Sequence, residues 1–267
     1  MTDLFFKDLI DYLNARYPQD YAEDWDKVGL HFGHINNPVK RVMVALDLRP
    51  QVVAEALEQK IDTLILHHPP IFHAIDRFDW SDPQIKMYQT VIQAGMNVFA
   101  MHTNYDAAPG GMNDILAQAL RLEAVQPFKE LVEGQVAIGR VGLLPQALTR
   151  HELFAYIKQT FKRSSLTVIE KVPRASYQKI AIVGGAGASF MDQVERVGPD
   201  VFITGDISYH TGHDLYEKAF MTIDAGHYIE HLFIDVEVAR IQKHVAEKGW
   251  DIEVIASSVS TDPFTYQ

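Results

Sequence analysis

The 267-residue sequence contains no cysteine. This absence excludes disulfide bonds, thiolate nucleophiles, zinc ribbons and iron–sulfur clusters held by cysteine. Any metal ion must therefore be held by histidine, aspartate or glutamate side chains. A chain without cysteine is compatible with a reducing compartment, and we expect a cytoplasmic location.

Long apolar runs and an excess of basic residues are also missing. No stretch reaches the roughly 18 apolar residues that a membrane-spanning helix needs, so no membrane partner is expected. The first residues lack the basic start and unbroken apolar centre of a signal peptide. Lys and Arg number 24 against 35 Asp and Glu, which gives a net charge of −11. Because this charge repels phosphate backbones, broad nucleic-acid binding is not expected.

What the sequence does contain is a regular alternation of short apolar runs and helical patterns. The runs that predict strands are Val42–Leu48, Asp62–Leu66, Asn97–His102, Ile138–Leu144, Lys179–Val183, Asp200–Thr204, Phe220–Asp224 and Ile252–Ala256. The segments that predict helices are Gln51–Lys60, Gln84–Ala94, Asn113–Leu120, Arg150–Phe161, Phe190–Val197, Asp214–Lys218 and Ile234–Lys248. Strands that alternate with helices predict a layered α/β fold with mainly parallel strands.

The length gives a soft expectation of one or two domains. The strand–helix alternation loosens near residues 124–178, so the sequence predicts two related α/β lobes. The first lobe covers residues 1–125, an intervening segment over residues 126–178 belongs to the second lobe, and residues 179–267 complete that lobe. We expect a metal site at the carboxyl ends of the strands, between the lobes, because ligands of open α/β sheets gather at strand ends.

Two adjacent histidines, His67 and His68, follow one predicted strand and precede two prolines. Neighbouring residues of an extended chain point to opposite sides, so this pair is suited to serve two metal ions rather than to chelate one. The alternative is a surface or hydrogen-bonded histidine pair. The prolines cannot donate ladder hydrogen bonds and end the strand.

Two further strand ends supply carboxylates. Asp106 precedes a turn-forming run and is suited either to bridge two metal ions or to cap the following helix. His227 and Glu230 are three residues apart and would share a face if a helix begins there, while His231 is a competing ligand one position later. Imidazole and carboxylate ligands suit zinc, iron(II) or manganese.

Three other features have two interpretations each. His102 ends an apolar strand, a position more typical of a packed or ligand-orienting histidine than of a direct metal ligand. His213 follows another strand and is suited to orient a ligand or to transfer protons. The loop Gly184–Gly187 predicts a tight structural turn, with phosphate binding as the alternative.

Taken together, seven motifs resemble the NIF-three-like dinuclear metal-binding family, whose bacterial members are often named GTP cyclohydrolase I type 2 homologs. The motifs are Trp25–Leu30 (WDKVGL), Leu64–Phe72 (LILHHPPIF), His102–Asp106 (HTNYD), Gly139–Pro145 (GRVGLLP), Ile182–Gly187 (IVGGAG), Thr204–Asp206 (TGD) and Asp224–Glu230 (DAGHYIE). The resemblance implies two metal ions per chain, held by His67, His68, Asp106, His227 and Glu230. It also implies a ring-shaped homohexamer, and His213 matches a histidine position near the family's site.

Two classes of function follow. The first is a metal-dependent hydrolase, in which two ions generate hydroxide from water near neutral pH. In the cyclohydrolase version, hydroxide attacks C8 of a guanine nucleotide while His213 or His102 transfers protons. In the phosphoesterase version, hydroxide attacks phosphorus. The second class is a non-catalytic metal-binding or regulatory hexamer.

Overall fold

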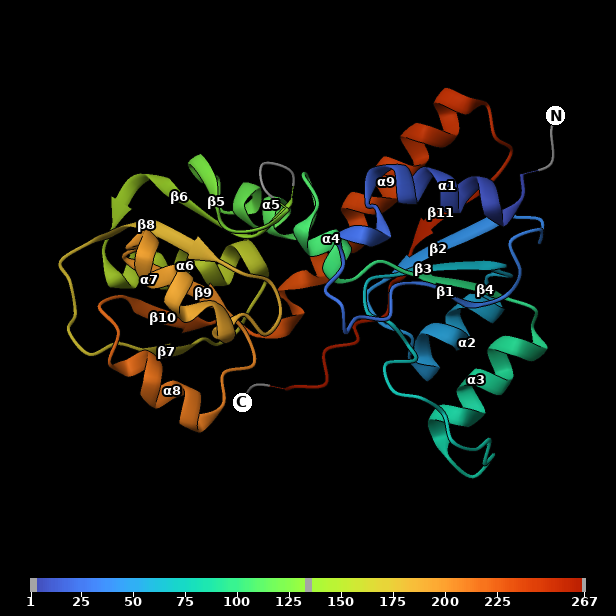
Figure 1. Cartoon of the computed structure of the whole chain (residues 1–267), viewed down its shortest axis with the longest axis horizontal. Helices are drawn as coiled ribbons and strands as arrows, with labels where there is room; N and C mark the ends of the chain where they lie inside the picture. Colours follow the sequence, from blue (N-terminus) through green and yellow to red (C-terminus); the bar gives the residue numbers. More distant parts are fainter. Residues whose placement is uncertain (1–3, 133–135, 266–267) are drawn as a thin grey trace. The chain divides into compact units, whose positions relative to one another are not determined.

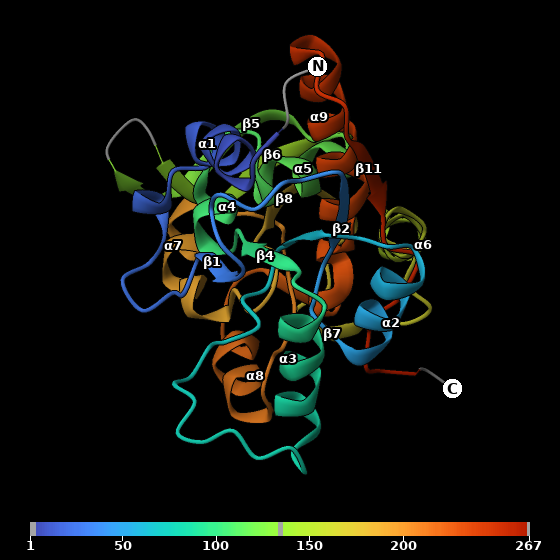
Figure 2. The same ribbon diagram turned by 90° about the vertical axis from the view of Figure 1, so that its right-hand side faces the viewer.

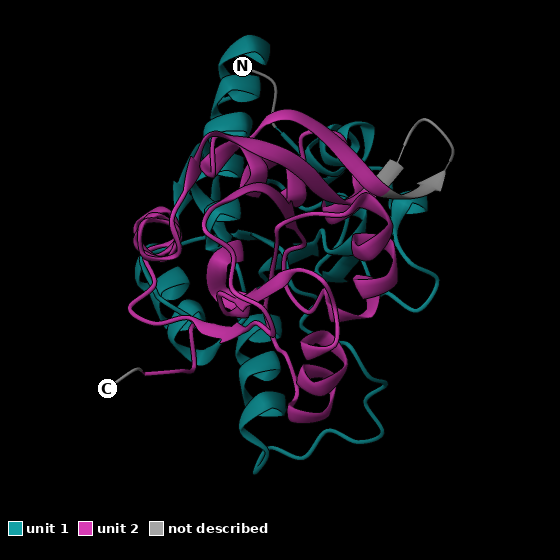
Figure 3. Cartoon of the chain, turned by 90° about the vertical axis from the view of Figure 1, so that its left-hand side faces the viewer, with its two compact units in different colours: residues 1–105, 231–261 teal, residues 106–230, 262–267 magenta. Residues whose placement is uncertain are grey.

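The computed structural model describes residues 4–132 and 136–265 and divides the chain into two compact units. Unit 1 consists of Met1–Tyr105 and His231–Thr261, and unit 2 consists of Asp106–Glu230 and Asp262–Gln267 (Figure 3). The chain therefore changes unit at residues 105/106, at 230/231 and at 261/262, which differs from the predicted ranges 1–125, 126–178 and 179–267. The difference arises because residues 106–125 pack in unit 2 and the last long helix packs in unit 1.

Unit 1 is built on a five-stranded sheet (Figure 1). Its strands, in spatial order, are β1 (Gly29–Phe32), β4 (Asn97–Ala100), β3 (Thr63–Leu66), β2 (Arg41–Ala45) and β11 (Glu253–Ala256). The strands from β4 to β11 are parallel, and β1 pairs antiparallel with β4. The parallel strands read as unbroken apolar runs because helices cover both faces.

The helices of unit 1 lie on opposite faces of this sheet (Figures 1 and 2). They are α2 (Pro50–Glu58) and α3 (Pro83–Gln93) on one face, and α1 (Phe6–Arg16) and α9 (Leu232–Lys248) on the other. Helix α1 begins at Phe6, and residues 1–3 lie outside the described part. Asp82 caps the start of helix α3, where its side chain accepts a hydrogen bond from Gln84 N. Pro83 is the first residue of the helix, a position at which the missing N–H of proline has no partner to lose.

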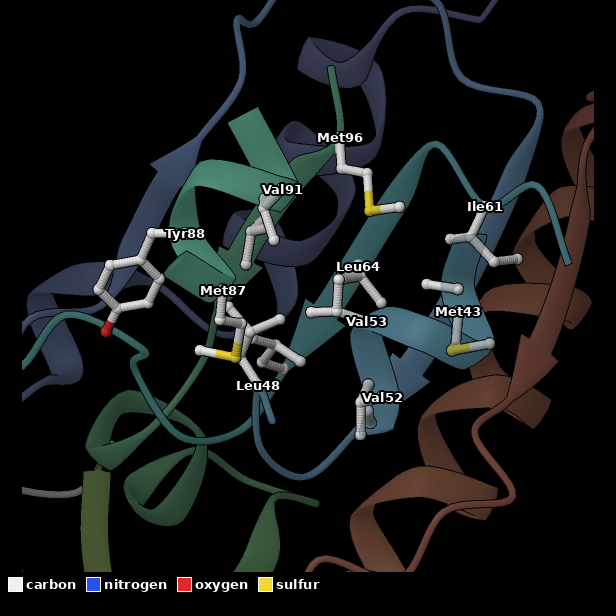
Figure 4. Close-up of a cluster of buried hydrophobic side chains, with 14 of the residues drawn as sticks. Met43, Leu48, Val52, Val53, Ile61, Leu64, Met87, Tyr88, Val91 and Met96 are labelled. Atoms are coloured by element: carbon white, nitrogen blue, oxygen red, sulfur yellow. The ribbon is translucent and has the colours of Figure 1, made fainter. Parts of the chain in front are cut away.

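In the core of unit 1, successive side chains of strand β3 point to opposite faces of the sheet. Leu64 and Leu66 of β3 point to the side of α2 and α3, where they join Val53 and Tyr88 in a buried apolar cluster (Figure 4). Thr63 and Ile65 are equally buried but face the other side, as expected for a period of two. A rigid sheet thus fixes where β3 ends, immediately before His67.

Unit 2 is built on a six-stranded sheet. In spatial order its strands are β5 (Glu123–Val132), β6 (Val136–Leu148), β8 (Tyr177–Ile182), β9 (Val201–Thr204), β10 (Met221–Asp224) and β7 (Thr167–Ile169). Strands β8, β9 and β10 are parallel, and the other pairs are antiparallel. The helices of this unit are α5 (Met112–Ala119), α6 (Arg150–Phe161), α7 (Met191–Val197) and α8 (Tyr209–Tyr216).

The described part of the chain also contains four short helical segments: α4 (Thr103–Ala107) and the 3₁₀ turns η1 (Gln19–Tyr21), η2 (Ala188–Phe190) and η3 (His227–His231). The two sheets with alternating helices confirm the predicted α/β class. Parallel pairing joins β4, β3, β2 and β11 in one sheet and β8, β9 and β10 in the other, and the remaining pairs are antiparallel. Every helix in the described residues is too short or too polar to cross a membrane.

Candidate metal-binding site

Three histidines of unit 1 lie at one edge of its sheet. His67 and His68 follow β3, and His102 follows the neighbouring parallel strand β4. Parallel neighbours end at the same edge of a sheet, so the three side chains converge. One ring nitrogen from each lies within 4.8 Å of the other two. These residues form what we call the histidine set.

The adjacent pair does not keep the strict alternation of a strand. The ring centroids of His67 and His68 are 4.8 Å apart, with their planes tilted by 47°. The strand ends at Leu66, so the chain bends at the two histidines and brings both rings to one region. His67 is fully buried, packed against the rings of Tyr105 and Phe233.

Each histidine of this set directs its Nδ1 atom at an oxygen. The Nδ1 atom of His67 is 2.8 Å from the carbonyl oxygen of Met101, that of His68 is 2.7 Å from Asp47 Oδ1, and that of His102 is 2.9 Å from Asp26 Oδ1. Carbonyl and carboxylate oxygens accept hydrogen bonds, so Nδ1 is the nitrogen that carries the proton. The Nε2 lone pair is then the one that a metal ion can take.

The two carboxylates behind these histidines are held in the ionised form. Burial acts to raise the pKa of Asp26, but hydrogen bonds from His102 and Thr103 outweigh it and lower the pKa to about 2. Burial likewise opposes ionisation of Asp47, and hydrogen bonds from His68 and Thr261 outweigh it and lower its pKa. Both carboxylates are therefore negative near neutral pH and hold the Nδ1 proton in place.

Unit 2 contains a second set of ligands, which we call the carboxylate set: Asp106, His227 and Glu230. The carboxylate oxygens of Asp106, in α4, and Glu230, in η3, lie within 4.8 Å of each other. Glu230 is 2% exposed, and its Oε2 is 3.0 Å from His227 Nε2. Residues i and i+3 eclipse in a 3₁₀ turn, which explains why Glu230 meets His227.

His227 follows the same orientation rule as the histidines of unit 1. Its Nδ1 atom lies 2.7 Å from Asp206 Oδ2, in the loop after β9. Its Nε2 atom is thereby turned toward the Glu230 carboxylate. An imidazole nitrogen beside a carboxylate is a ligand combination suited to zinc, iron or manganese.

The glycine loop after β8 packs closely against this set. A Cβ atom at Gly184 would lie 2.8 Å from Glu230 Oε1, and one at Gly185 would lie 3.0 Å from it and 3.1 Å from His227 Nε2. Gly185 also has a φ of +57°, which side chains disfavour. Glycine at these two positions lets the loop approach Glu230 and His227 closely, and this close packing fits the tight-turn interpretation.

Two of the sequence candidates lie apart from these sets. His213 is exposed on α8, with its ring 4.8 Å from that of Tyr209. His231 is partly exposed at the end of η3. Among the described residues, neither belongs to a group of histidines and carboxylates whose ligand atoms all lie within 4.8 Å of one another.

Sequence reasoning missed two residues of this arrangement. Asp47 has no role in the sequence analysis because it falls inside the predicted strand 42–48, whereas β2 ends at Ala45. Asp26 is part of the WDKVGL motif, but nothing in that motif points to His102, which is 76 residues away. The signal that could have found Asp47 is its charge, which interrupts the otherwise apolar run Val42–Leu48.

Comparison with known proteins adds to this geometry. A family model described as Duf34/NIF3 (NGG1p interacting factor 3) matches residues 5–263. A Streptococcus pneumoniae protein named "GTP cyclohydrolase 1 type 2 homolog" is 36% identical over 260 residues, covering 96% of this chain and 97% of that protein. A Lactococcus lactis protein of the same name is 32% identical over 249 residues, covering 92% and 93%.

Solved structures share the fold. A Staphylococcus aureus hypothetical protein superimposes with a TM-score of 0.93 at 27% identity, covering the whole of both chains. A Bacillus cereus protein related to NIF3 gives a TM-score of 0.95 at 22% identity, again over both whole chains. At that identity, the second match shows the fold alone.

Proposed function

This chain belongs to the Duf34/NIF3 family, and from that premise we propose that it is a metal-dependent hydrolase acting on a nucleotide. Relatives at 36% and 32% identity carry the name "GTP cyclohydrolase 1 type 2 homolog". Those names support a reaction in which water adds to the ring of a guanine nucleotide. The proposal depends first on the metal ligands.

We propose His67, His68, Asp106, His227 and Glu230 as the ligands of two divalent ions per chain. One observation carries this assignment: each of the three histidines has an oxygen acceptor on Nδ1, so Nε2 is the nitrogen directed to bind. The glycine loop beside Glu230 and His227 supports it, because a Cβ atom there would fill the space next to both ligand atoms. The donor set, imidazole with carboxylate, fits zinc, iron or manganese.

Bound divalent ions would lower the pKa of a water molecule and polarise the carbon or phosphorus atom under attack. Side chains of the protein would transfer the protons. The ionised Asp26 fixes the Nδ1 proton of His102, which leaves Nε2 of that ring to accept or return a proton. His213 is a second candidate for proton transfer, on the exposed surface of α8.

The first experiment measures the metal content of the untagged protein by elemental analysis, beside the variants His68→Ala and His73→Ala. About two ions in the parent, fewer in His68→Ala and no change in His73→Ala are expected, because His73 is an exposed histidine of the same unit. Equal metal content in all three proteins would remove His68 from the site.

The second experiment measures turnover of guanine nucleotides by the metal-loaded protein. Loss of the purine ring absorbance without phosphate release supports the cyclohydrolase reaction. Phosphate release with an intact ring would replace it with phosphoesterase chemistry. Full metal content with no turnover of any nucleotide contradicts the hydrolase proposal and leaves a metal-binding or regulatory role. The variants His102→Gln and His213→Gln then test which histidine transfers protons, at unchanged metal content.

A further inference from the structure

Two half-exposed aromatic side chains flank the histidine set within unit 1. Trp25, in the loop before β1, is 54% exposed, and Phe72, in the segment after the histidine pair, is 43% exposed. Their ring centroids are 5.8 Å apart with planes at 58°. The edge of Trp25 also faces His102, at a centroid distance of 6.1 Å and an angle of 75°.

The chain on either side of this aromatic pair is anchored beside the histidine set. Asp26, the next residue after Trp25, accepts hydrogen bonds from Thr103 N and Thr103 Oγ1 at 2.9 and 2.5 Å and lies 2.9 Å from His102 Nδ1. Phe72 follows His68 by four residues, across two prolines that stiffen the chain. The contacts that orient His102 therefore also anchor the residue next to Trp25, and the Trp25 ring contacts Phe72 and His102.

We propose that Trp25 and Phe72 form a binding platform for the planar ring of a nucleobase whose reacting group is presented to the histidine set. This inference rests on the proposed function and adds residues that recognise the substrate. Every base has an aromatic face, and stacking on protein aromatics is a recurrent mode of base binding. The chain carries a net charge of −11, so its overall attraction for the phosphate of a nucleotide is weak. The uncharged base is therefore the part of a nucleotide that an aromatic platform can select.

A second exposed aromatic pair in the same unit provides a matched control. Phe78 and Trp80 are 59% and 51% exposed, with ring centroids 6.2 Å apart. Among the described residues, neither has a ring contact with a histidine. Removing this pair changes a similar amount of exposed aromatic surface without touching the platform.

The test uses the fluorescence of Trp25 as a direct reporter. The chain has three tryptophans, so the double variant Trp80→Phe/Trp250→Phe leaves Trp25 alone. Guanosine monophosphate is expected to quench this fluorescence saturably, and ribose 5-phosphate, which lacks the base, is expected not to. In that background, Phe72→Ala should weaken guanosine monophosphate binding by about 5- to 140-fold, and Phe78→Ala by less than about twofold.

Four results would overturn the platform. One is equal binding of ribose 5-phosphate and guanosine monophosphate, and another is unchanged affinity in Phe72→Ala. The third is a change in the molar mass of Phe72→Ala with unchanged affinity, which would make the pair a contact between copies of the chain. Metal content is measured in every variant, and metal loss in Phe72→Ala would reduce its role to structure. The quenching assay needs neither metal nor turnover, so it remains readable if the hydrolase proposal fails.

Discussion

A single aspartate can influence the affinity of a metal site without contacting the metal. It does so when its carboxylate lies at the Nδ1 atom of a histidine that binds the metal through Nε2. In the proposed metal site, Asp47 does this for His68 and Asp206 does it for His227. Such partners fix the ring orientation and make the opposite nitrogen a better ligand. Residues that would never be selected as ligands are therefore expected to control the site.

Asp47→Asn should weaken metal binding by about 10- to 100-fold while the fold is kept, because the amide is neutral and no longer increases the basicity of His68. A competition titration against a chromophoric chelator measures the affinity. Asp79→Asn is the control, since Asp79 is exposed and bonds to Ser81. Identical affinities in the two variants would show that Asp47 has a structural role alone.

Glu230 and His231 are adjacent residues with opposite environments. Glu230 is buried against His227, and His231 is partly exposed. Glu230→Gln should therefore lower metal content substantially, and His231→Gln should leave it near the parent value. Elemental analysis of both variants, with circular dichroism to verify folding, decides the question. The reverse ranking would assign the ligand to His231.

Most of the proposed ligands could be selected from the sequence because they follow predicted strands. His67, His68, Asp106, His227 and Glu230 all follow apolar runs that are visible in the sequence. Asp47 was hidden because the run Val42–Leu48 continues past the true end of β2 at Ala45. Contacts between residues distant along the chain, such as Asp26 with His102, follow from the folded arrangement and have no local pattern.

At the scale of secondary structure, the strands that the sequence missed are β1, β5 and β7, which all lie at sheet edges and pair antiparallel. Edge strands need less apolar sequence than central ones. Strand β5 contains Pro127, a residue that a central strand does not tolerate. Apolar periodicity therefore finds the parallel strands of each sheet, the edge strand β11 included, and overlooks the antiparallel edge strands.

Helix α8 was predicted at Asp214–Lys218 but spans Tyr209–Tyr216. Its start is set by Ser208, whose side chain accepts from Thr211 N. The N-cap signal was present in the sequence, but the helix is largely polar, so its beginning has no apolar pattern. The shift matters because it places His213 within the helix, on an exposed surface.

Glu55 links helix α2 to the segment after β11. Its Oε1 accepts from Ser258 N at 2.9 Å and from Ser258 Oγ at 2.6 Å, and its Oε2 accepts from Ser257 Oγ at 2.5 Å. Partial burial acts to raise the pKa of Glu55, and these hydrogen bonds outweigh it and lower the pKa. A carboxyl whose pKa is lower in the folded state stabilises that state above its unfolded pKa.

Glu55→Gln should therefore reduce the free energy of unfolding at pH 7, by no more than about 1 kcal/mol because the group is partly exposed. The difference from the parent should shrink as the pH falls below about 4.3, the ordinary pKa of glutamate, and through the lower folded-state value. Urea unfolding at several pH values measures it. Glu58→Gln, exposed on the same helix, serves as the control. A difference that stays constant with pH would exclude the Glu55 charge as its source.

At the scale of the whole molecule, we propose the homohexamer that the family resemblance implies. Each chain has a mass of 30.2 kDa, so six chains would give about 181 kDa. Light scattering coupled to gel filtration measures this mass directly at several protein concentrations. A concentration-independent mass of one or two chains would contradict the hexamer.

The division of the chain also has a consequence for its synthesis. Unit 2 occupies one nearly continuous stretch, whereas unit 1 needs both its first 105 residues and the returning segment His231–Thr261. As the chain leaves the ribosome, unit 2 can complete its sheet while the sheet of unit 1 still lacks β11 and the covering helix α9. The residues of the histidine set are therefore synthesised early, but unit 1 can fold around them only after its last segment has been made. A ribosome that stalls after residue 230 would release a chain in which unit 2 is folded and unit 1 is unfinished.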